Sequence, residues 1–455
     1  MDPMILSRWQ FAITTIYHFF LVPLTLGLSI LVAIFESRYV ATGNETYKRL
    51  AKFWGKIFVI NYAAGVVTGI VQEFHFGLNW SEYARFMGDI FGAPLAIEAL
   101  LAFYLESTFI GVWIFGWDKL SKKMHLAAAW LVAIGSNISA LWILIANSFM
   151  QNPVGYAIEN GRAVMTDFMA IVTNPNLPYQ YFHVLSAGVA TAGFLVLGFS
   201  AWHLLKNKKD DVEFFQRAFK WAAVYALIGA VMVGLLGDLH GKYLGKHQPM
   251  KIAAAEAVWV TEDPADFRVI AGIDEAQQTN TFELLVPKAL SFLLYNKFTG
   301  EVRGLKDLQS EADAMYLDQY GSANYIPPVA LSFWSFRIMV GSGTLMALLA
   351  FLAVLRPRIK LLQKNTLFLK ALIPAIFLPY IASTSGWILT ETARQPWIVY
   401  GLQKVEDAVS PNLTGGTVLL SLIVFTVLMN ATVGVTGWLM FKYGTSDPKA
   451  EKAAG

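Results

Sequence analysis

The chain has 455 residues, of which 56% are hydrophobic and 15% charged, and its mean hydropathy is +0.48. A soluble domain does not expose that much apolar surface without aggregating, so the composition indicates a membrane protein. The net charge is only +3. The sequence has no cysteine, which excludes structural disulfides, thiolate-bound iron–sulfur clusters and heme attached through C-x-x-C-H.

Apolar runs long enough to cross a bilayer as helices recur along the whole chain. The first has no basic leader and no small-residue cleavage site, so we expect it to be retained. The sequence therefore predicts an all-α integral membrane protein with nine transmembrane helices. They are expected at 11–35, 53–72, 94–116, 125–148, 181–205, 218–236, 332–355, 367–390 and 416–441.

Basic residues are concentrated in alternate connections between these helices. Lysine and arginine are frequent in loops 36–52, 117–124, 206–217 and 356–366, whereas 73–93 and 149–180 hold one arginine each. Basic loops face the cytoplasm of bacterial membranes. We therefore expect the N-terminus outside and the C-terminus in the cytoplasm.

One connection is far longer than the others. Residues 237–331 are polar and acidic, contain aromatic residues, and include a predicted amphipathic stretch at 304–318. The topology places this segment outside, where it is expected to fold as a lid. The sequence thus divides into helices one to six (1–236), the extracytoplasmic loop (237–331), and helices seven to nine with a tail (332–455).

Several ionisable or metal-binding side chains fall inside the predicted spans or at their ends, where such groups mark a ligand, a pathway or a pair. Buried histidines often serve structure, most of the fourteen methionines are core residues, and boundary arginines often snorkel. Membrane carboxylates are harder to explain without function. The candidates are His18, Glu98, Glu106, His183, Arg337, Met339, Glu391 and Arg394.

Four of these residues lie in the outer halves of four different helices, namely His18, His183, Met339 and Glu391. A histidine and a methionine on facing helices can ligate a low-spin heme, and a second histidine and a carboxylate can hold further iron. Arginines suit heme propionates. Glu391 is then a ligand or a charge partner.

Glu98 and Glu106 are eight residues apart on one predicted helix. An α-helix separates them by about 12 Å and roughly 80° of rotation, so we expect them to border one proton path without touching. No histidine pair with the spacing of a heme–copper centre or of a two-heme cytochrome b bundle occurs within one span, and copper is not expected.

At this point the sequence resembles subunit I of the cytochrome bd-type quinol oxidases, of the short Q-loop type. The resemblance runs from residue 7 through the ninth helix. It is carried by these stretches: YHFFLVPLTLG, KFWGKIFVINYAAGVVTGIVQEF, GDIFGAPLAIEALLAFYLESTF, GSNISALWILIANSFMQNP, KIAAAE, FRIMV and GWILTETARQPW.

The resemblance implies a role for each candidate. His183 and Met339 would ligate the low-spin heme b, while His18 and Glu391 would serve two high-spin hemes, one of type b and one of type d. Glu98 would lie beside the oxygen-reducing heme and Glu106 on the proton path. The remaining implied residues are Arg337 and Arg394 at propionates, Trp387 as an aromatic neighbour, and Lys251 and Glu256 at the quinol.

The implied reaction oxidises membrane quinol outside and reduces O2 to water with cytoplasmic protons, which generates a proton gradient without pumping. A second large membrane subunit and a small single-span subunit are implied in a bacterial cell membrane. The chain departs from the family's GRQPW at Ala393. The alternatives are an oxidase of the same family with only heme b, and a proton-coupled transporter.

Overall fold

The structure is a computed structural model that describes residues 2–206 and 212–448. Within those ranges nine helical segments are long and apolar enough to cross a membrane, as predicted. The tail from 449 and part of the basic loop 206–217 lie outside the described residues. The spans are α1 (Pro3–Thr42), α2 (Glu45–Leu78), α3 with α4 (Ser81–Phe115), α5 (Lys122–Gln151), α6 with α7 (Phe168–Lys206), α8 (Val212–His247), α12 (Val329–Leu355), α14 with α15 (Thr366–Thr392) and α16 (Gly415–Gly444).

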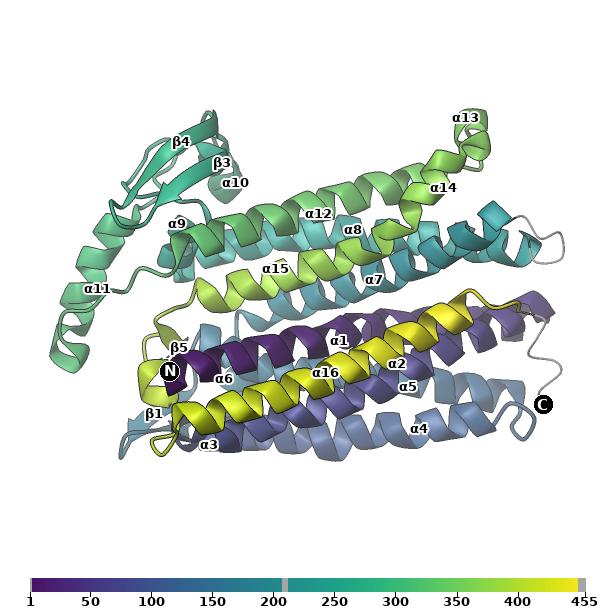
Figure 1. Cartoon of the computed structure of the whole chain (residues 1–455), viewed down its shortest axis with the longest axis horizontal. Helices are drawn as coiled ribbons and strands as arrows, with labels where there is room; N and C mark the ends of the chain where they lie inside the picture. Colours follow the sequence, from purple (N-terminus) through teal and green to yellow (C-terminus); the bar gives the residue numbers. More distant parts are fainter. Residues whose placement is uncertain (1, 207–211, 449–455) are drawn as a thin grey trace.

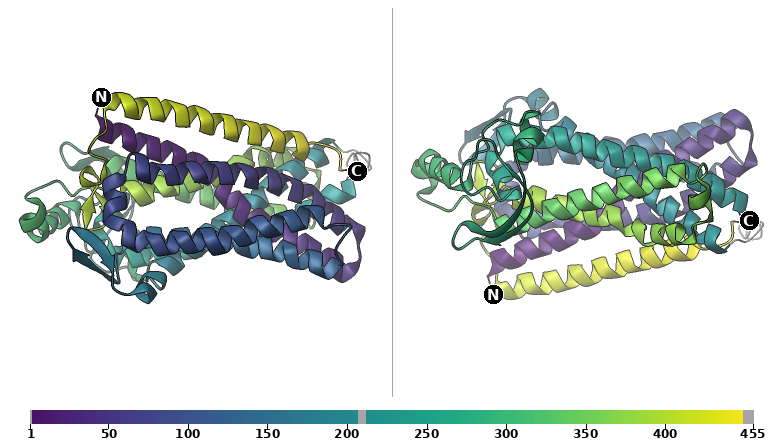
Figure 2. Two further views of the ribbon diagram at one scale, coloured as in Figure 1. Left: turned by 90° about the horizontal axis from the view of Figure 1, so that it is seen from below. Right: turned by 90° about the horizontal axis from the view of Figure 1, so that it is seen from above.

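The spans form two adjoining groups of helices (Figure 1). Helices α7, α8, α12 and α15 lie together, and α1, α2, α4, α5 and α16 form the other group. Helix α1 packs against both α2 and α7 and so joins the groups. The N-terminus and the long α8–α12 connection lie at one end of the bundle, which we call the loop end. The opposite, basic end carries the α1–α2, α4–α5 and α12–α14 connections, and Figure 2 shows the same two ends from above and below.

The third span is not a continuous α-helix. It consists of α3 (Ser81–Ile97), a π-helix (Glu98–Phe103) and α4 (Tyr104–Phe115). A π turn takes up one extra residue, so Glu98 and Glu106 are related by the rotation of seven α-helical residues, about 20° instead of 80°. The rotation of roughly 80° expected for a regular helix is therefore too large, and both carboxylates face α5.

The eighth span is also interrupted. Helix α14 (Thr366–Leu372) passes through a short 3-10 helix (Pro374–Phe377) into α15 (Leu378–Thr392). Pro374 and Pro379 lack the amide hydrogen that a continuous helix needs. Helix α15 ends at Thr392, close to the predicted end before Pro396.

The long connection contains helices and strands of its own, and it begins later than expected, because α8 continues to His247. It contains α9 (Pro249–Ala255), the antiparallel strands β3 (Phe267–Asp274) and β4 (Thr279–Val286), α10 (Ala289–Tyr295) and α11 (Leu305–Tyr320). Helix α11 confirms the amphipathic stretch. Ala253, Ala254, Leu305 and Phe333 share a core that seats α9 and α11 on the start of α12.

Helix α11 is anchored to the segment that follows α15. There β5 (Trp397–Val399) pairs with β6 (Gln403–Lys404). The Trp397 ring lies 4.7 Å from the Tyr316 ring and 5.4 Å from the Tyr320 ring, and the Tyr320 hydroxyl donates to the Leu402 carbonyl at 2.8 Å. The long connection is thus tied to the end of the helix that carries Glu391. The remaining elements are β1 (Tyr156–Glu159), β2 (Arg162–Met165), α13 (Lys360–Lys364) and a 3-10 turn (Glu406–Ala408).

Candidate functional site

His183 and Met339 lie in the group formed by α7, α8, α12 and α15. Each has a glycine of a neighbouring helix beside it. A Cβ added to Gly237 on α8 would lie 3.4 Å from His183 Cε1, and one added to Gly386 on α15 would lie 3.0 Å from Met339 Sδ. Within the described chain, the buried Nδ1 of His183 has no hydrogen-bond partner. The two side chains therefore lie where helices approach closely, and His183 retains a ring nitrogen for another group.

His18 on α1 is oriented by α2. Its Nδ1 lies 2.9 Å from the Thr68 hydroxyl, which donates its own proton to the carbonyls of Ala64 and Gly65. Because that hydroxyl has no second proton to give, we assign the hydrogen to His18 Nδ1. The lone pair is then on Nε2, the tautomer that a metal requires. Gly69 leaves room for the ring.

Glu391 at the end of α15 is surrounded by donors. Arg394, one turn later, forms an ion pair with Oε2, and Asn147 of α5 donates to Oε1 at 3.2 Å. Gln151 donates to the same Oε1 at 3.4 Å. Arg394 is buried and keeps Nη1 without a partner among the described residues. Glu391 thus accepts hydrogen bonds from three side chains, and Arg394 retains a donor for another group.

Trp387 lies one turn before Glu391, as the sequence indicated. Its ring meets Phe19 of α1 edge to face at 5.1 Å between centroids. Phe19 follows His18 directly, so this contact brings the neighbourhood of His18 close to the α15 segment. The two helix groups therefore meet at the aromatic residues beside two of the candidate ligands.

Glu98 and Glu106 are both bound by serines of α5. Ser139 donates to Glu98 Oε1 at 2.6 Å, and Ser136 donates to Glu106 Oε1. A Cβ added to Gly135 would lie 3.1 Å from Glu106 Cβ, so the glycine permits this close approach of α4. The two carboxylates form a short polar row along one helix face.

Lys251 and Glu256 are both buried at the base of the long connection but face different partners. Lys251 Nζ donates to Gln151 Oε1 at 2.6 Å, which directs it toward Glu391. Glu256 pairs with Arg337 Nη2 at 2.6 Å. Lys251 therefore lies on the Glu391 side of α9, and Glu256 on the α12 side.

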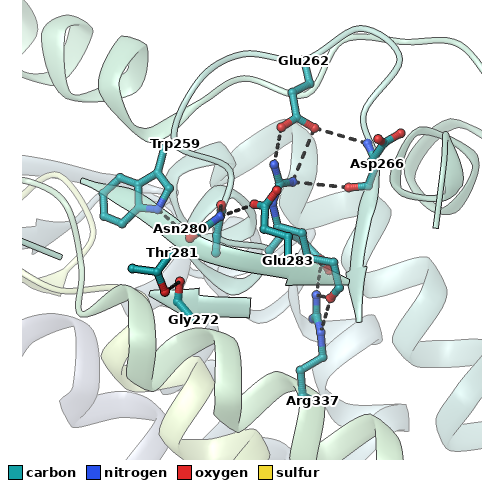
Figure 3. A network of polar contacts seen from close by, with 11 residues as sticks. Trp259, Glu262, Asp266, Gly272, Asn280, Thr281, Glu283 and Arg337 are labelled. Atoms are coloured by element: carbon teal, nitrogen blue, oxygen red, sulfur yellow. Dashed lines mark hydrogen bonds and ion pairs between the residues drawn. The ribbon is translucent and has the colours of Figure 1, made fainter. Parts of the chain in front are cut away.

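Arg337 fastens the long connection to α12. Besides pairing with Glu256, its Nε donates to the Arg268 carbonyl at 2.8 Å, and its guanidinium lies 4.2 Å from the Phe333 ring centroid. Figure 3 shows Arg337 reaching the β-hairpin, above which Glu262 and Glu283 bind the Arg268 side chain. Arg337 thus contacts residues of the long connection and of α12.

Burial perturbs both charged residues of α9. Desolvation, aided by the positive charge of Arg394 and opposed by Glu391, lowers the pKa of Lys251 to about 7. Desolvation raises the pKa of Glu256, while Arg337 and Arg268 oppose that rise. A buried lysine whose pKa is lowered to about 7 beside a buried carboxyl whose pKa is raised is typical of proton-transfer chemistry.

The sequence reasoning missed the side chains that orient these candidates. They are Thr68, Ser136, Ser139, Asn147, Gln151 and Gln248, the last of which donates to the Gln151 carbonyl. One signal was available, because Ser136, Ser139 and Asn147 recur at helical spacing along α5. The sequence did not show which residues these side chains contact.

Known proteins resemble this chain over nearly its full length. A model of the family described as cytochrome bd terminal oxidase subunit I matches residues 6–448. Subunit 1 of a Bacillus subtilis cytochrome bd ubiquinol oxidase is 50% identical, over 94% of this chain and 90% of that protein. Subunit 1 of the Escherichia coli cytochrome bd-II ubiquinol oxidase is 39% identical, over 99% and 98%.

The fold matches as well. The structure of the bd oxidase from Geobacillus thermodenitrificans superposes with a TM-score of 0.87 at 30% identity, and the match covers 97% of this chain and 98% of that one. Sequence and structure thus agree over nearly the full length. The chain belongs to the family of subunit I of the cytochrome bd terminal oxidases.

Proposed function

We propose that this chain carries the hemes of a respiratory oxidase that oxidises membrane quinol at the loop end and reduces O2 to water. The observation that carries the proposal is the convergence of His18, His183, Met339 and Glu391 in the half of the bundle nearest the long connection. Family membership implies heme cofactors, a quinol donor, a partner subunit II and a bacterial membrane location.

The residues fit such groups. His183 and Met339 would hold a low-spin heme b beside Gly237 and Gly386, whose missing side chains suit a flat macrocycle. His18, through Nε2, and Glu391 would hold one high-spin heme b and one heme d. When bound, these hemes supply one-electron transfer and oxygen reduction. The spare donor of Arg394 suits a propionate, with Trp387 packed nearby.

The buried base of the long connection would bind the quinol head group. Glu256 would accept a proton from a quinol hydroxyl, and Lys251 would donate a hydrogen bond to a quinone oxygen. Arg337 pairs with Glu256 and opposes the rise of its pKa, and so would act on the quinol through that residue, in addition to the propionate role that the sequence suggested. Protons released here leave at the loop end.

The protons consumed would enter from the opposite side. The basic end faces the cytoplasm in this proposal, with the N-terminus outside, and Glu106 and Glu98 pass protons toward the oxygen site with help from Ser136 and Ser139. Opposite-side proton release and uptake separates charge without a pump. A small single-span subunit would complete the complex.

The test is the reduced-minus-oxidised visible spectrum of the complex, with Met339→Leu as the decisive variant. Loss of the thioether should change the low-spin b band and lower quinol oxidation. Met346→Leu is the matched control, because Met346 is a buried core residue of the same helix. A normal low-spin band with normal activity in Met339→Leu would refute the ligand assignment.

The same spectrum separates the alternatives. A red-shifted chlorin band that moves with carbon monoxide supports heme d. Bands of heme b alone would indicate the all-heme-b oxidase. A folded complex without any heme would favour a proton-coupled transporter.

A further inference from the structure

The side-chain amide of Gln151 joins the proposed quinol contact to a candidate heme ligand. Gln151 is the last residue of α5 and is buried. Its Oε1 accepts a hydrogen bond from Lys251 Nζ at 2.6 Å, and its Nε2 donates to Glu391 Oε1 at 3.4 Å. One amide therefore bridges α9 in the long connection and the end of α15.

The orientation of this amide is fixed by its neighbours. The Gln248 side chain bonds to the Gln151 backbone carbonyl, and because a carbonyl only accepts, Gln248 must turn its Nε2 toward α5. The same Nε2 lies 3.4 Å from Gln151 Oε1. Lys251 and Gln248 therefore both donate to Oε1, which leaves Gln151 Nε2 facing the Glu391 carboxylate.

Lys251 keeps donors for a further group. Among the residues that the structure describes, its Nζ contacts one acceptor, Gln151 Oε1. A lysine ammonium has three N–H groups, so the others remain for an oxygen of a bound quinol. A quinol oxygen and the Gln151 amide would therefore share one buried cation.

We propose that Gln151 is a positioning residue through which the quinol contact at Lys251 sets the charge on Glu391. Hydrogen bonds in a chain polarise one another, and groups bonded to a metal ligand tune the metal. A quinol oxygen that accepts from Lys251 weakens the bond to Gln151, which then donates more weakly to Glu391. The carboxylate keeps more charge for the iron that it is proposed to ligate, and this lowers the heme potential. The inference rests on the proposed function, which supplies both the quinol contact and the heme ligand.

A second route reaches the same oxygen of Glu391 without passing through the long connection. Asn147 donates to Glu391 Oε1 at 3.2 Å and accepts from Gln180 Nε2 at 2.6 Å. Gln180 of α7 is buried and accepts from the Ser148 hydroxyl at 2.8 Å. This route supports Glu391 from α5 and α7, which makes Gln180 the matched control for Gln151.

The test is Gln151→Met in the complete complex, with the midpoint potential of the high-spin heme bands as the readout. Each complex is titrated with and without an alkyl-hydroxyquinoline N-oxide, a redox-inactive quinol analogue, at a concentration that fully inhibits quinol oxidation. In the parent complex the analogue should lower the potential of one high-spin heme. Methionine has no N–H to donate to Glu391, so the shift should be lost in Gln151→Met, whereas Gln180→Met should keep it.

Gln151→Glu answers the same question if Gln151→Met does not assemble. Its carboxylate keeps an oxygen for Lys251 and Gln248 but has no N–H for Glu391, so the shift should again be lost. The inference would be overturned by the absence of a shift in the parent, by an equal shift in the parent and the Gln151 variant, or by loss of the shift in Gln180→Met. A parent complex that contains no heme or does not oxidise quinol would instead refute the proposed function.

Discussion

The Glu256–Arg337 pair shows how a single contact can set the chemistry of the proposed quinol site. Glu256 must be ionised to accept a proton, yet its burial raises its pKa. Arg337 opposes that effect with a charge-assisted hydrogen bond at 2.6 Å. Arg337 is therefore expected to keep Glu256 able to accept a proton at lower pH than it could without the arginine.

Replacing Arg337 with glutamine should move the rising limb of quinol kcat/KM to higher pH. Without the guanidinium the pKa of Glu256 increases, so a larger share of the carboxyl is protonated at low pH. Because hydrogen bonds to charged groups contribute about 1.5–3 kcal/mol, kcat/KM on the acidic side should fall by roughly tenfold or more. The pH profile with a soluble quinol analogue measures this.

Arg303→Gln is the matched control, because Arg303 pairs with Glu311 elsewhere in the same connection. It should leave the rising limb in place. The falling limb of the kcat/KM profile near pH 7, where Lys251 loses its proton, should keep its position in both variants. A rising limb that does not move in Arg337→Gln would contradict the role of the pair.

At the scale of elements, α5 provides partners for carboxylates of three other membrane spans. His125 meets Glu36, Ser136 meets Glu106, Ser139 meets Glu98, and Asn147 meets Glu391. The residues of α5 concerned lie on one side because they recur at helical spacing. Helix α5 thus connects the basic end to the loop end through polar contacts.

Gly135→Ala tests the close approach of α4 to this helix. The added methyl would lie 3.1 to 3.3 Å from three atoms of Glu106, so α4 must move and both serine contacts should lengthen. Overpacking of this kind costs about 1–3 kcal/mol. The thermal midpoint of the detergent-solubilised complex should fall.

Gly111→Ala is the control, because a Cβ there would meet nothing within 4 Å and alanine favours a helix. It should leave the midpoint unchanged or raise it. Equal midpoints for the two variants would show that the α4–α5 contact is not tight.

Much of the fold could be predicted from the sequence, because membrane helices need long apolar runs whatever they pack against. The number of spans followed from that rule, and helix α11 followed from its amphipathic pattern. The π-helix at Glu98–Phe103 did not, because it depends on packing between α3, α4 and α5. Its absence from the prediction is why the expected rotation between Glu98 and Glu106, roughly 80°, was too large.

The candidate site, like the fold, could be predicted only in part. His18, His183 and Glu391 were recognisable because such side chains are unusual in lipid. Taken by itself, Met339 could not be recognised as a candidate, since methionine is also a common core residue. Thr68 and Gln151 were missed because a polar side chain reveals its partner only when the helices are placed together.

At the scale of the whole molecule, the two ends of the bundle differ in both charge and structure. The long connection covers one end, and the lysine- and arginine-rich turns occupy the other. The proposed function depends on the side of the membrane that each end faces, because quinol protons must leave on one side and oxygen must draw protons from the other. Membrane orientation is therefore a requirement of the mechanism.

The absence of cysteine makes this orientation directly measurable. Ala276→Cys places one thiol in the exposed β3–β4 turn, and Lys123→Cys places one on the exposed first turn of α5. In intact spheroplasts a membrane-impermeant maleimide should label Ala276→Cys and leave Lys123→Cys unlabelled, whereas permeabilised membranes should label both. The parent chain, without a thiol, gives the background. The reverse pattern would place the basic end outside and would require quinol oxidation on the cytoplasmic side, so that proton release and uptake no longer separate charge in the proposed direction.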